Sequence, residues 1–184
     1  MKKIDWTSIK PKQQRYEAEP ENRDALELDS IIIEDTRNHV DIWADTRRDL
    51  EDIGVGTYRS KLAVGDYAPP PPIAIDTKRG FAELCQNFCS SDHGRVRSEI
   101  LRAQAMGTQL IFLVIDDAAT SIDDAKNWHN PFGFISGERL FKTLDTVSKR
   151  YGVRFIFCKP SQAATTIKGL LAPYLHPYDS TKAE

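Results

Sequence analysis

The sequence predicts one α/β domain with a mixed central sheet flanked by helices. Short runs of β-branched and aromatic residues alternate along the chain with segments whose apolar residues recur at helical spacing. The 184 residues, 40% of them hydrophobic, are enough for one domain with a sizeable core. The run 110–115 is apolar throughout, as expected of a central strand covered on both faces.

The elements follow from periodicity and from the residues that end them. The predicted strands are 31–33, 58–67, 73–78, 110–115 and 153–157, and the predicted helices are 42–53, 79–88, 92–106, 136–151 and 161–172. Prolines 69–72 are expected to form a stiff hairpin connection, because proline donates no ladder hydrogen bond. The acidic, turn-rich segment 116–131 is expected to be a loop or an insertion, which leaves Trp128 and His129 unexplained.

The ends of the chain differ in composition from its centre. Residues 1–28 are polar, mix both charge signs and lack a clear period, which favours an extended or partly disordered N-terminal arm. The segment 29–175 contains all the predicted elements and is interpreted as the domain, and 176–184 is a polar tail. The basic residues of the arm, such as Lys2 and Lys3, indicate a nucleic-acid-binding arm or a solubilising tail equally well.

Overall charge and cysteine content exclude several classes of protein. Twenty-five Lys and Arg against twenty-seven Asp and Glu give a net charge of -2, so any phosphate-binding surface must be local. Three cysteines without zinc-type spacing, and a start without the apolar core of a signal peptide, predict a reducing cytoplasm. No apolar run approaches the roughly 20 residues that span a bilayer, so no membrane partner is expected.

Two carboxylates and one ammonium fall on adjoining extended segments. Asp66 follows an apolar run, nine residues separate it from Asp76, and Asp76 and Lys78 share one face of a strand because they are two residues apart. Magnesium needs only one or two carboxylates besides waters and a substrate phosphate. The carbonyl of Thr77 can add a third oxygen, and Asp35, at the end of another strand, can complete the site or support a second ion.

Lys78 has three possible roles beside such a metal. Its ammonium can position the attacking water or stabilise charge on phosphorus, and with a depressed pKa its amine can accept a proton. The sequence does not choose among them. The Asp-x-Lys spacing also arises by chance in a chain with 28% charged residues, so its context matters: Gly65 precedes Asp66, and apolar runs precede both carboxylates.

These residues occur in an order that resembles a known family. Ile31 to Arg37, then Leu62 to Tyr67, Asp76-Thr77-Lys78, and Gly94-Arg95 with Glu99 beyond are similar to the nuclease domain of the XPF/Hef family. That family is a branch of the PD-(D/E)xK nucleases, and its motif GDx9ERKx3D has the gap seen here. The resemblance covers roughly Ser30 to Asp116, and the small size resembles stand-alone bacterial or prophage members.

The resemblance implies a restriction-endonuclease-like fold and cleavage of branched DNA, such as flaps and forks, in DNA repair or recombination with Mg²⁺ or Mn²⁺. It also implies a homodimer. By the family pattern Asp35, Asp66 and Asp76 are metal ligands, Lys78 is the catalytic lysine, and Arg95 assists at the phosphate. Arg95 also follows a glycine at a predicted helix start, where phosphate is favoured.

Three positions depart from the family motif. Asp76 stands where the family has glutamate, Thr77 replaces arginine, and Ala82 occupies the position of the last aspartate, with Glu83 next to it. A catalytically silent DNA-binding or scaffolding module is therefore a rival hypothesis, and a junction resolvase or restriction-type nuclease is another.

Other polar residues have both a functional and a structural interpretation. Arg37, Arg79 and Arg97 can line a DNA path with Arg95, but the charges between Asp35 and Arg102 nearly cancel, which also fits a solvated mixed face. Cys85 and Cys89 lie four apart on a predicted helix and are more typical of small core residues than of ligands. The four histidines lack partners at ligand spacing.

Overall fold

The computed structural model describes residues 30–68, 73–91, 93–131 and 133–175. The predicted arm, the predicted proline hairpin and the polar tail lie outside the described residues. Within the described residues, no helix is long and apolar enough to cross a membrane.

Within the described part of the chain, six strands form one mixed sheet. They are β1 (Ser30–Asp35), β2 (Val55–Ser60), β3 (Tyr67–Ala68), β4 (Ile73–Lys78), β5 (Gln109–Ile115) and β6 (Arg154–Cys158). Their order in the sheet is β2-β1-β3-β4-β5-β6. The β1–β2, β4–β5 and β5–β6 pairs are parallel, whereas the short β3 pairs antiparallel with both β1 and β4. The predicted α/β class with a mixed sheet is confirmed.

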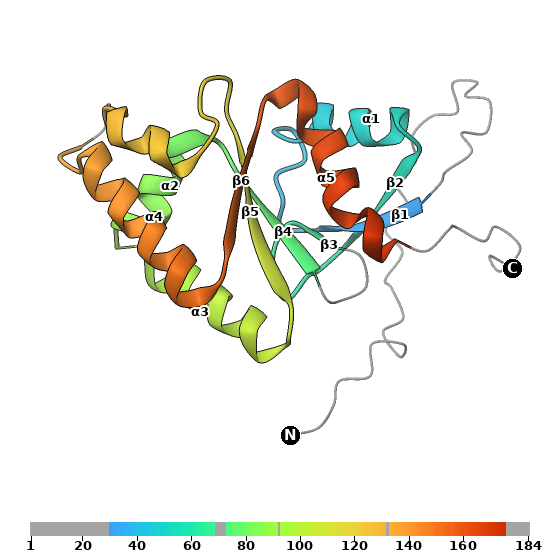
Figure 1. Cartoon of the computed structure of the whole chain (residues 1–184). Coiled ribbons are helices and arrows are strands. Elements are labelled where there is room, and N and C mark those ends of the chain that lie inside the picture. The colour runs from blue at the N-terminus through green and yellow to red at the C-terminus, as the bar shows by residue number, and fades with distance from the viewer. Residues whose placement is uncertain (1–29, 69–72, 92, 132, 176–184) are drawn as a thin grey trace, which may run out of the picture.

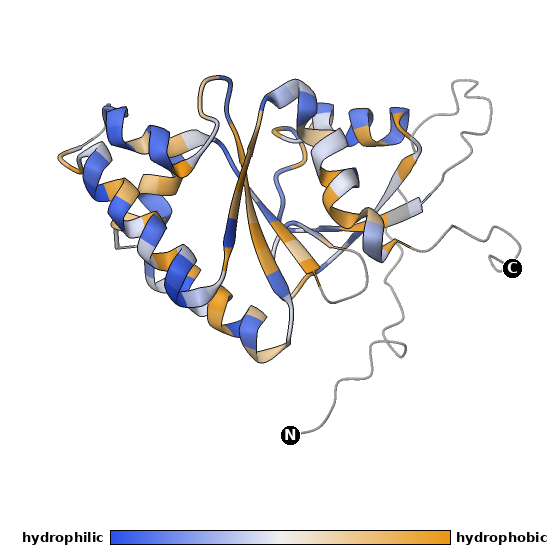
Figure 2. Cartoon of the chain, viewed as in Figure 1, coloured by the Kyte–Doolittle hydropathy of each residue, from blue (hydrophilic) through white to orange (hydrophobic). Residues whose placement is uncertain are grey.

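Helices cover both faces of the sheet (Figure 1). One layer contains α2 (Gly80–Cys89), α3 (His93–Ala105) and α4 (Gly137–Tyr151), and the opposite layer contains α1 (Ala44–Asp52) and α5 (Ala163–Leu171). Short 3₁₀ turns lie at Ile122–Asn127, Pro160–Gln162 and Ala172–Tyr174. Strand β5 is hydrophobic along most of its length, whereas the helices mix hydrophobic and hydrophilic residues (Figure 2). This pattern is that of a buried strand between amphipathic helices.

Each face of the sheet has its own apolar core. Phe112 and Val114 of β5 pack with Phe81, Leu84 and Ile100 beneath α2, α3 and α4. On the other face, alternate residues of the same strand pack with Leu50 of α1 and Ile167 of α5. Because successive side chains of a strand point to opposite faces, β5 contributes to both cores.

Two sequence predictions were wrong in detail. The strand predicted at 58–67 is divided, because β2 ends at Ser60 and only Tyr67–Ala68 rejoins the sheet. Gly65 interrupts the extended chain with a φ of +73°, in the left-handed region. The predicted loop 116–131 contains the 3₁₀ turn Ile122–Asn127, which a Ser121–Asp124 capping box begins.

That turn gives Trp128 a structural role. The Trp128 ring lies 6.2 Å from the ring of Phe81, between centroids, and packs against the core beneath α2 and α4. Trp128 is therefore an anchor of the 116–131 segment.

Candidate functional site

Strand β4 carries polar side chains into a buried environment. All six of its residues are buried, including Asp76, Thr77 and Lys78. Ala74 lies in the core beneath α2 and α3, so Asp76 and Lys78, at two-residue spacing, share its face. Burying two charged side chains on one strand is costly unless they are paired or used in function.

The turn at Gly65 brings Asp66 beside β4. A Cβ at residue 65 would lie 2.8 Å from the carbonyl oxygen of Ile75, so only glycine fits this close approach. The Asp66 amide donates to that same carbonyl at 2.6 Å. Thr77 then donates twice to Oδ2 of Asp66, from its amide at 2.8 Å and its hydroxyl at 2.6 Å. Oε1 of Glu99, on α3, accepts from the Gly65 amide at 2.9 Å.

A cavity of about 350 Å³ opens over these residues. Its lining includes Asp66, Asp76, Thr77 and Lys78, the acids Glu83 and Glu99, and the arginines Arg37, Arg79, Arg95 and Arg102. The structure therefore brings together three of the four residues predicted to be catalytic and three of the four predicted phosphate-binding arginines. Asp35 and Arg97 do not line it.

Lys78 and Asp76 form a buried ion pair. Nζ of Lys78 donates to Oδ1 of Asp76 and, at 3.4 Å, to the carbonyl oxygen of Thr77. The ammonium also lies 5.7 Å from the centroid of the Phe112 ring, which forms the apolar floor beneath it. The pair thus lies between the sheet core and the open cavity.

Burial raises the pKa values of the two aspartates. Desolvation raises the pKa of Asp76 well above its usual range, against the opposing effect of Lys78, and the charges of Asp66 and Glu99 raise it further. Desolvation also raises the pKa of Asp66, although the hydrogen bonds from Thr77 and the charge of Lys78 oppose it. A cation held by Asp66 and Asp76 would offset the repulsion between their negative charges.

The charge of Lys78 distinguishes among its predicted roles. Desolvation alone would lower the pKa of Lys78, but the charge and hydrogen bond of Asp76 and the charge of Asp66 outweigh it, so the pKa is raised. The side chain is therefore an ammonium at neutral pH. This disfavours proton acceptance and leaves water positioning and charge stabilisation on phosphorus.

Asp35 lies next to the site, but both oxygens of its carboxylate already accept hydrogen bonds from other residues. Its amide donates to the Asp66 carbonyl at 2.7 Å, so the end of β1 does reach the Gly65 turn. Its side chain, however, accepts from the Arg37 amide at 2.7 Å, from the Arg37 guanidinium at 2.9 and 2.5 Å, and from the Leu62 amide at 2.9 Å. Burial would raise the pKa of Asp35, but these hydrogen bonds outweigh it and lower the pKa. The Asp35 side chain thus fixes the positions of Arg37 and of the Leu62 backbone next to the site.

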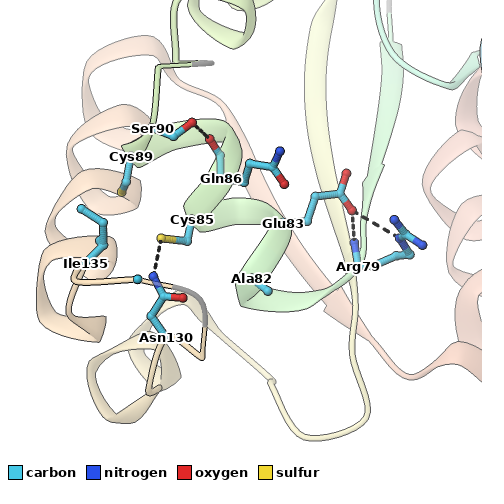
Figure 3. A pocket seen from close by; sticks show the side chains of 10 residues that line it. Arg79, Ala82, Glu83, Cys85, Gln86, Cys89, Ser90, Asn130 and Ile135 are labelled. Carbon is cyan, nitrogen blue, oxygen red and sulfur yellow. Dashed lines mark hydrogen bonds and ion pairs between the residues drawn. The ribbon is translucent and has the colours of Figure 1, made fainter.

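Helix α2 contributes one carboxylate to the cavity. Glu83 lines the cavity, whereas Ala82 does not. The Glu83 carboxylate accepts from the Arg79 amide at 2.8 Å and lies 3.6 Å from the Arg79 guanidinium. Glu83, one residue beyond Ala82 on α2, therefore adds a carboxylate to the cavity, and Arg79 contacts it (Figure 3).

Helix α3 adds a row of charged residues that the sequence analysis only partly identified. Arg95, Glu99 and Arg102 all line the cavity, at spacings of four and three residues on one helix face. Arg102 was not among the predicted site residues, although its seven-residue spacing from Arg95 was a usable signal. Arg97, between them in sequence, is exposed outside the cavity lining.

The cavity offers few protein ligands for a metal. Within the described residues, no three His, Cys, Asp or Glu side chains lie together as a metal-holding group. Magnesium requires fewer, because it keeps several waters and binds through one or two carboxylates together with substrate phosphate. Asp66, Asp76 and the Thr77 carbonyl fit this requirement, since all three residues line one cavity.

Comparison with solved structures agrees with this architecture. The chain is similar to XPF from Aeropyrum pernix, with a TM-score of 0.58 and 16% identity over 78% of this chain and 66% of that chain. It is also similar to XPF from Aeropyrum pernix in complex with DNA, with a TM-score of 0.58 and 15% identity over 78% of this chain and 64% of that chain. The chain thus spans just under two thirds of those chains.

No family model and no curated protein matches the sequence. The class is therefore defined by fold: a six-stranded mixed sheet between two helical layers. More particularly, the fold is that of the XPF structures, which confirms the restriction-endonuclease-like architecture that the sequence resemblance predicted.

Proposed function

We propose that this protein is a metal-dependent DNA endonuclease that hydrolyses phosphodiesters at or near branches such as flaps and forks. The observation that carries the proposal is the convergence of Asp66, Asp76 and Lys78 in one cavity, although the first and last lie twelve positions apart in the sequence. The fold shared with the XPF structures, one of them in complex with DNA, supports it.

Asp66, Asp76 and the Thr77 carbonyl would hold Mg²⁺ or Mn²⁺ in this proposal. When bound, the ion would activate a water and polarise the phosphoryl oxygens. The chain's own contribution is orientation and charge. Thr77 fixes the Asp66 carboxylate through two hydrogen bonds, and the Lys78 ammonium, already ordered by Asp76, stabilises charge that grows on phosphorus.

The arginines around the cavity would bind the DNA backbone. Arg95 and Arg102 form one side, and Arg37 and Arg79 also line the cavity. Arginine is suited to phosphate because its guanidinium donates bidentate hydrogen bonds. Such contacts fix the register of the duplex and carry no sequence information, as a structure-selective nuclease requires.

Finer aspects of the proposal rest on the family resemblance. They are a role in DNA repair or recombination, a homodimer that adds grip on DNA, a cytoplasmic location, and kinship with small stand-alone bacterial or prophage nucleases. Three free cysteines, Cys85, Cys89 and Cys158, are consistent with a reducing compartment.

The test is cleavage of labelled flap, fork, four-way junction and linear duplex DNA with Mg²⁺ or Mn²⁺. The proposal predicts cuts near branches that disappear in chelator and in Asp76→Asn, while Arg97→Ala cleaves like the wild type. Lack of cleavage with either ion, or full cleavage by Asp76→Asn, would reject it. Faster cutting of four-way junctions or plain duplex would instead favour a resolvase or restriction-type nuclease.

A catalytically silent branched-DNA-binding module is the second candidate. Two observations favour it: Lys78 already occupies one oxygen of Asp76, and Glu83, the acid next to Ala82, is engaged by Arg79. This candidate predicts binding of branched DNA that persists in chelator, no cleavage, and no heat of Mn²⁺ binding.

A further inference from the structure

One wall of the candidate site is a segment without regular secondary structure. It is the segment 36–43, which joins β1 to α1, and its residues Arg37, Asn38, His39 and Trp43 line the cavity. The carbonyl groups of such a segment have no helical or sheet ladder to accept from, so they need other donors. The donors here come from a buried cluster of charged side chains.

Glu34 of β1 is the centre of this cluster and is an acid that the proposed chemistry does not use. Its side chain is 0% exposed and does not line the cavity. Ile32, two residues earlier, lies in the core beneath α1 and α5, so Glu34 points to that face of the sheet. A fully buried carboxylate is costly unless hydrogen-bonding or charged groups surround it.

Two arginines from different elements surround the Glu34 carboxylate. Arg47, on α1, donates to both of its oxygens, from Nε at 2.8 Å and from Nη2 at 3.2 Å, which is a bidentate pair. Arg59, on β2, is the register partner of Glu34, and its Nε lies 4.0 Å from Oε2. Asn38, from the segment itself, donates its side-chain amide to Oε1 at 3.3 Å.

The same arginines hold the backbone of the segment. Nη2 of Arg47 donates to the carbonyl oxygen of Val40 at 3.3 Å. Nη2 of Arg59 donates to three carbonyl oxygens at 3.4, 3.2 and 2.8 Å, which are those of Asp35, Thr36 and Asn38. Four consecutive or nearby carbonyls thus accept hydrogen bonds from arginines that Glu34 orients.

Stability alone does not account for a cluster of this kind. Apolar side chains of similar volume often stabilise a fold as well as a buried ion pair does. Apolar side chains cannot, however, donate to four carbonyl groups in fixed directions. The cluster is therefore suited to fixing one conformation of the segment.

We propose that Glu34, Arg47 and Arg59 are positioning residues that fix the segment 36–43 and, through it, the place of Arg37 in the cavity. This rests on the proposed nuclease function and deepens it, because it names residues outside the cavity on which its phosphate-binding wall depends. Without the cluster, the Arg37 guanidinium would keep its charge but lose its fixed position, and with it part of its contact with a DNA phosphate.

The first measurement is amide hydrogen exchange of the free protein, followed by mass spectrometry. Arg59→Met keeps the apolar stem but removes the donors, so exchange across 36–43, where amides donate to backbone carbonyls, should become about tenfold faster. Exchange in α4 of the same molecule should not change. Arg59→Lys keeps a charge beside Glu34, and with it the fold, but has a shorter reach, so it should show a smaller increase in the same segment.

The second measurement is affinity for one forked DNA in chelator, by fluorescence anisotropy, in two backgrounds. Arg59→Met should weaken binding about fivefold in the wild type but less than about twofold in Arg37→Ala, because the positioning acts through Arg37. A general loss of structure would weaken binding equally in both. Arg48→Met is the matched control, since Arg48 lies on α1 outside the cavity and pairs with Asp45 at 3.2 Å, and it should change neither exchange nor affinity.

Unchanged exchange in 36–43, an equal rise of exchange in α4, or equal affinity losses in the two backgrounds would overturn the positioning role, as would a wild type that binds no DNA. Both measurements are independent of cleavage. A protein that shows the predicted losses but never cleaves would refute the nuclease proposal alone. A protein that cleaves but loses affinity equally in both backgrounds would refute the positioning role alone.

Discussion

Replacing Lys78 with methionine tests whether the opposite charges of Lys78 and Asp76 compensate for the cost of burying each of them. Both side chains are buried, and the ammonium is the main favourable partner of the Asp76 carboxylate. Methionine keeps the apolar stem over Phe112 but removes the charge. Removing one partner of a buried pair leaves the other uncompensated and costs about 3–5 kcal/mol.

The assay is urea unfolding at pH 7. Lys78→Met should lose about 3–5 kcal/mol in unfolding free energy, whereas the double variant with Asp76→Leu should regain most of it, because an apolar pair replaces the ion pair. Lys149→Met is the matched control. Its ammonium is exposed and pairs with Asp145 at 2.8 Å, so its loss should cost less than about 1 kcal/mol.

The deficit should depend on pH with a defined sign. The pKa of Asp76 is raised in the folded protein, and loss of Lys78 raises it further, so the folded variant binds a proton more readily than the unfolded chain. Its stability therefore rises as pH falls through that raised pKa, and its deficit relative to wild type should shrink as the pH is lowered. A deficit below about 1 kcal/mol, or one unchanged with pH, would refute the reasoning.

Two further predictions concern the turn and the DNA-binding side of the site. Gly65→Ala should destabilise the protein by more than about 2 kcal/mol in thermal or chemical unfolding. The reason is that residue 65 has a left-handed φ and that its Cβ would lie 2.8 Å from a backbone oxygen. Gly94→Ala is the control and should not destabilise the protein, because the space around Gly94 is open. Arg95→Ala and Arg102→Ala should each reduce the slope of log affinity against log salt by about 0.9, measured on one duplex in chelator. Arg97→Ala, on the same helix but outside the cavity, should leave the slope unchanged; an equal effect of all three would contradict the assigned surface.

Much of the architecture followed from local chemistry in the sequence. The apolar run of β5, the Ser136 start and the Gly152 end of α4 are local signals, and the structure has a strand and a helix there. The division of the predicted strand 58–67 was harder to foresee. It depends on the Gly65 turn meeting the Ile75 carbonyl, and a two-residue strand is too short to show a period.

The sequence predicted only part of the candidate site, for a similar reason. Asp76 and Lys78 share a face by strand periodicity alone, and the Gly65 turn brings Asp66 beside them. Asp35 was expected to face the same site, but Arg37, two residues away, neutralises it. Side-chain pairing across a turn competes with metal ligation, and spacing in the sequence does not decide between them.

Titration of the protein with Mn²⁺ in a calorimeter tests the central claim most directly. If Asp66, Asp76 and the Thr77 carbonyl form a cation site beside the Lys78 ammonium, the wild type should bind about one ion per chain and Asp66→Asn should lose that binding while keeping its fold by circular dichroism. Asp145→Asn, a control on α4 outside the cavity, should bind like the wild type. Undiminished binding by Asp66→Asn, or no binding by the wild type, would contradict the account.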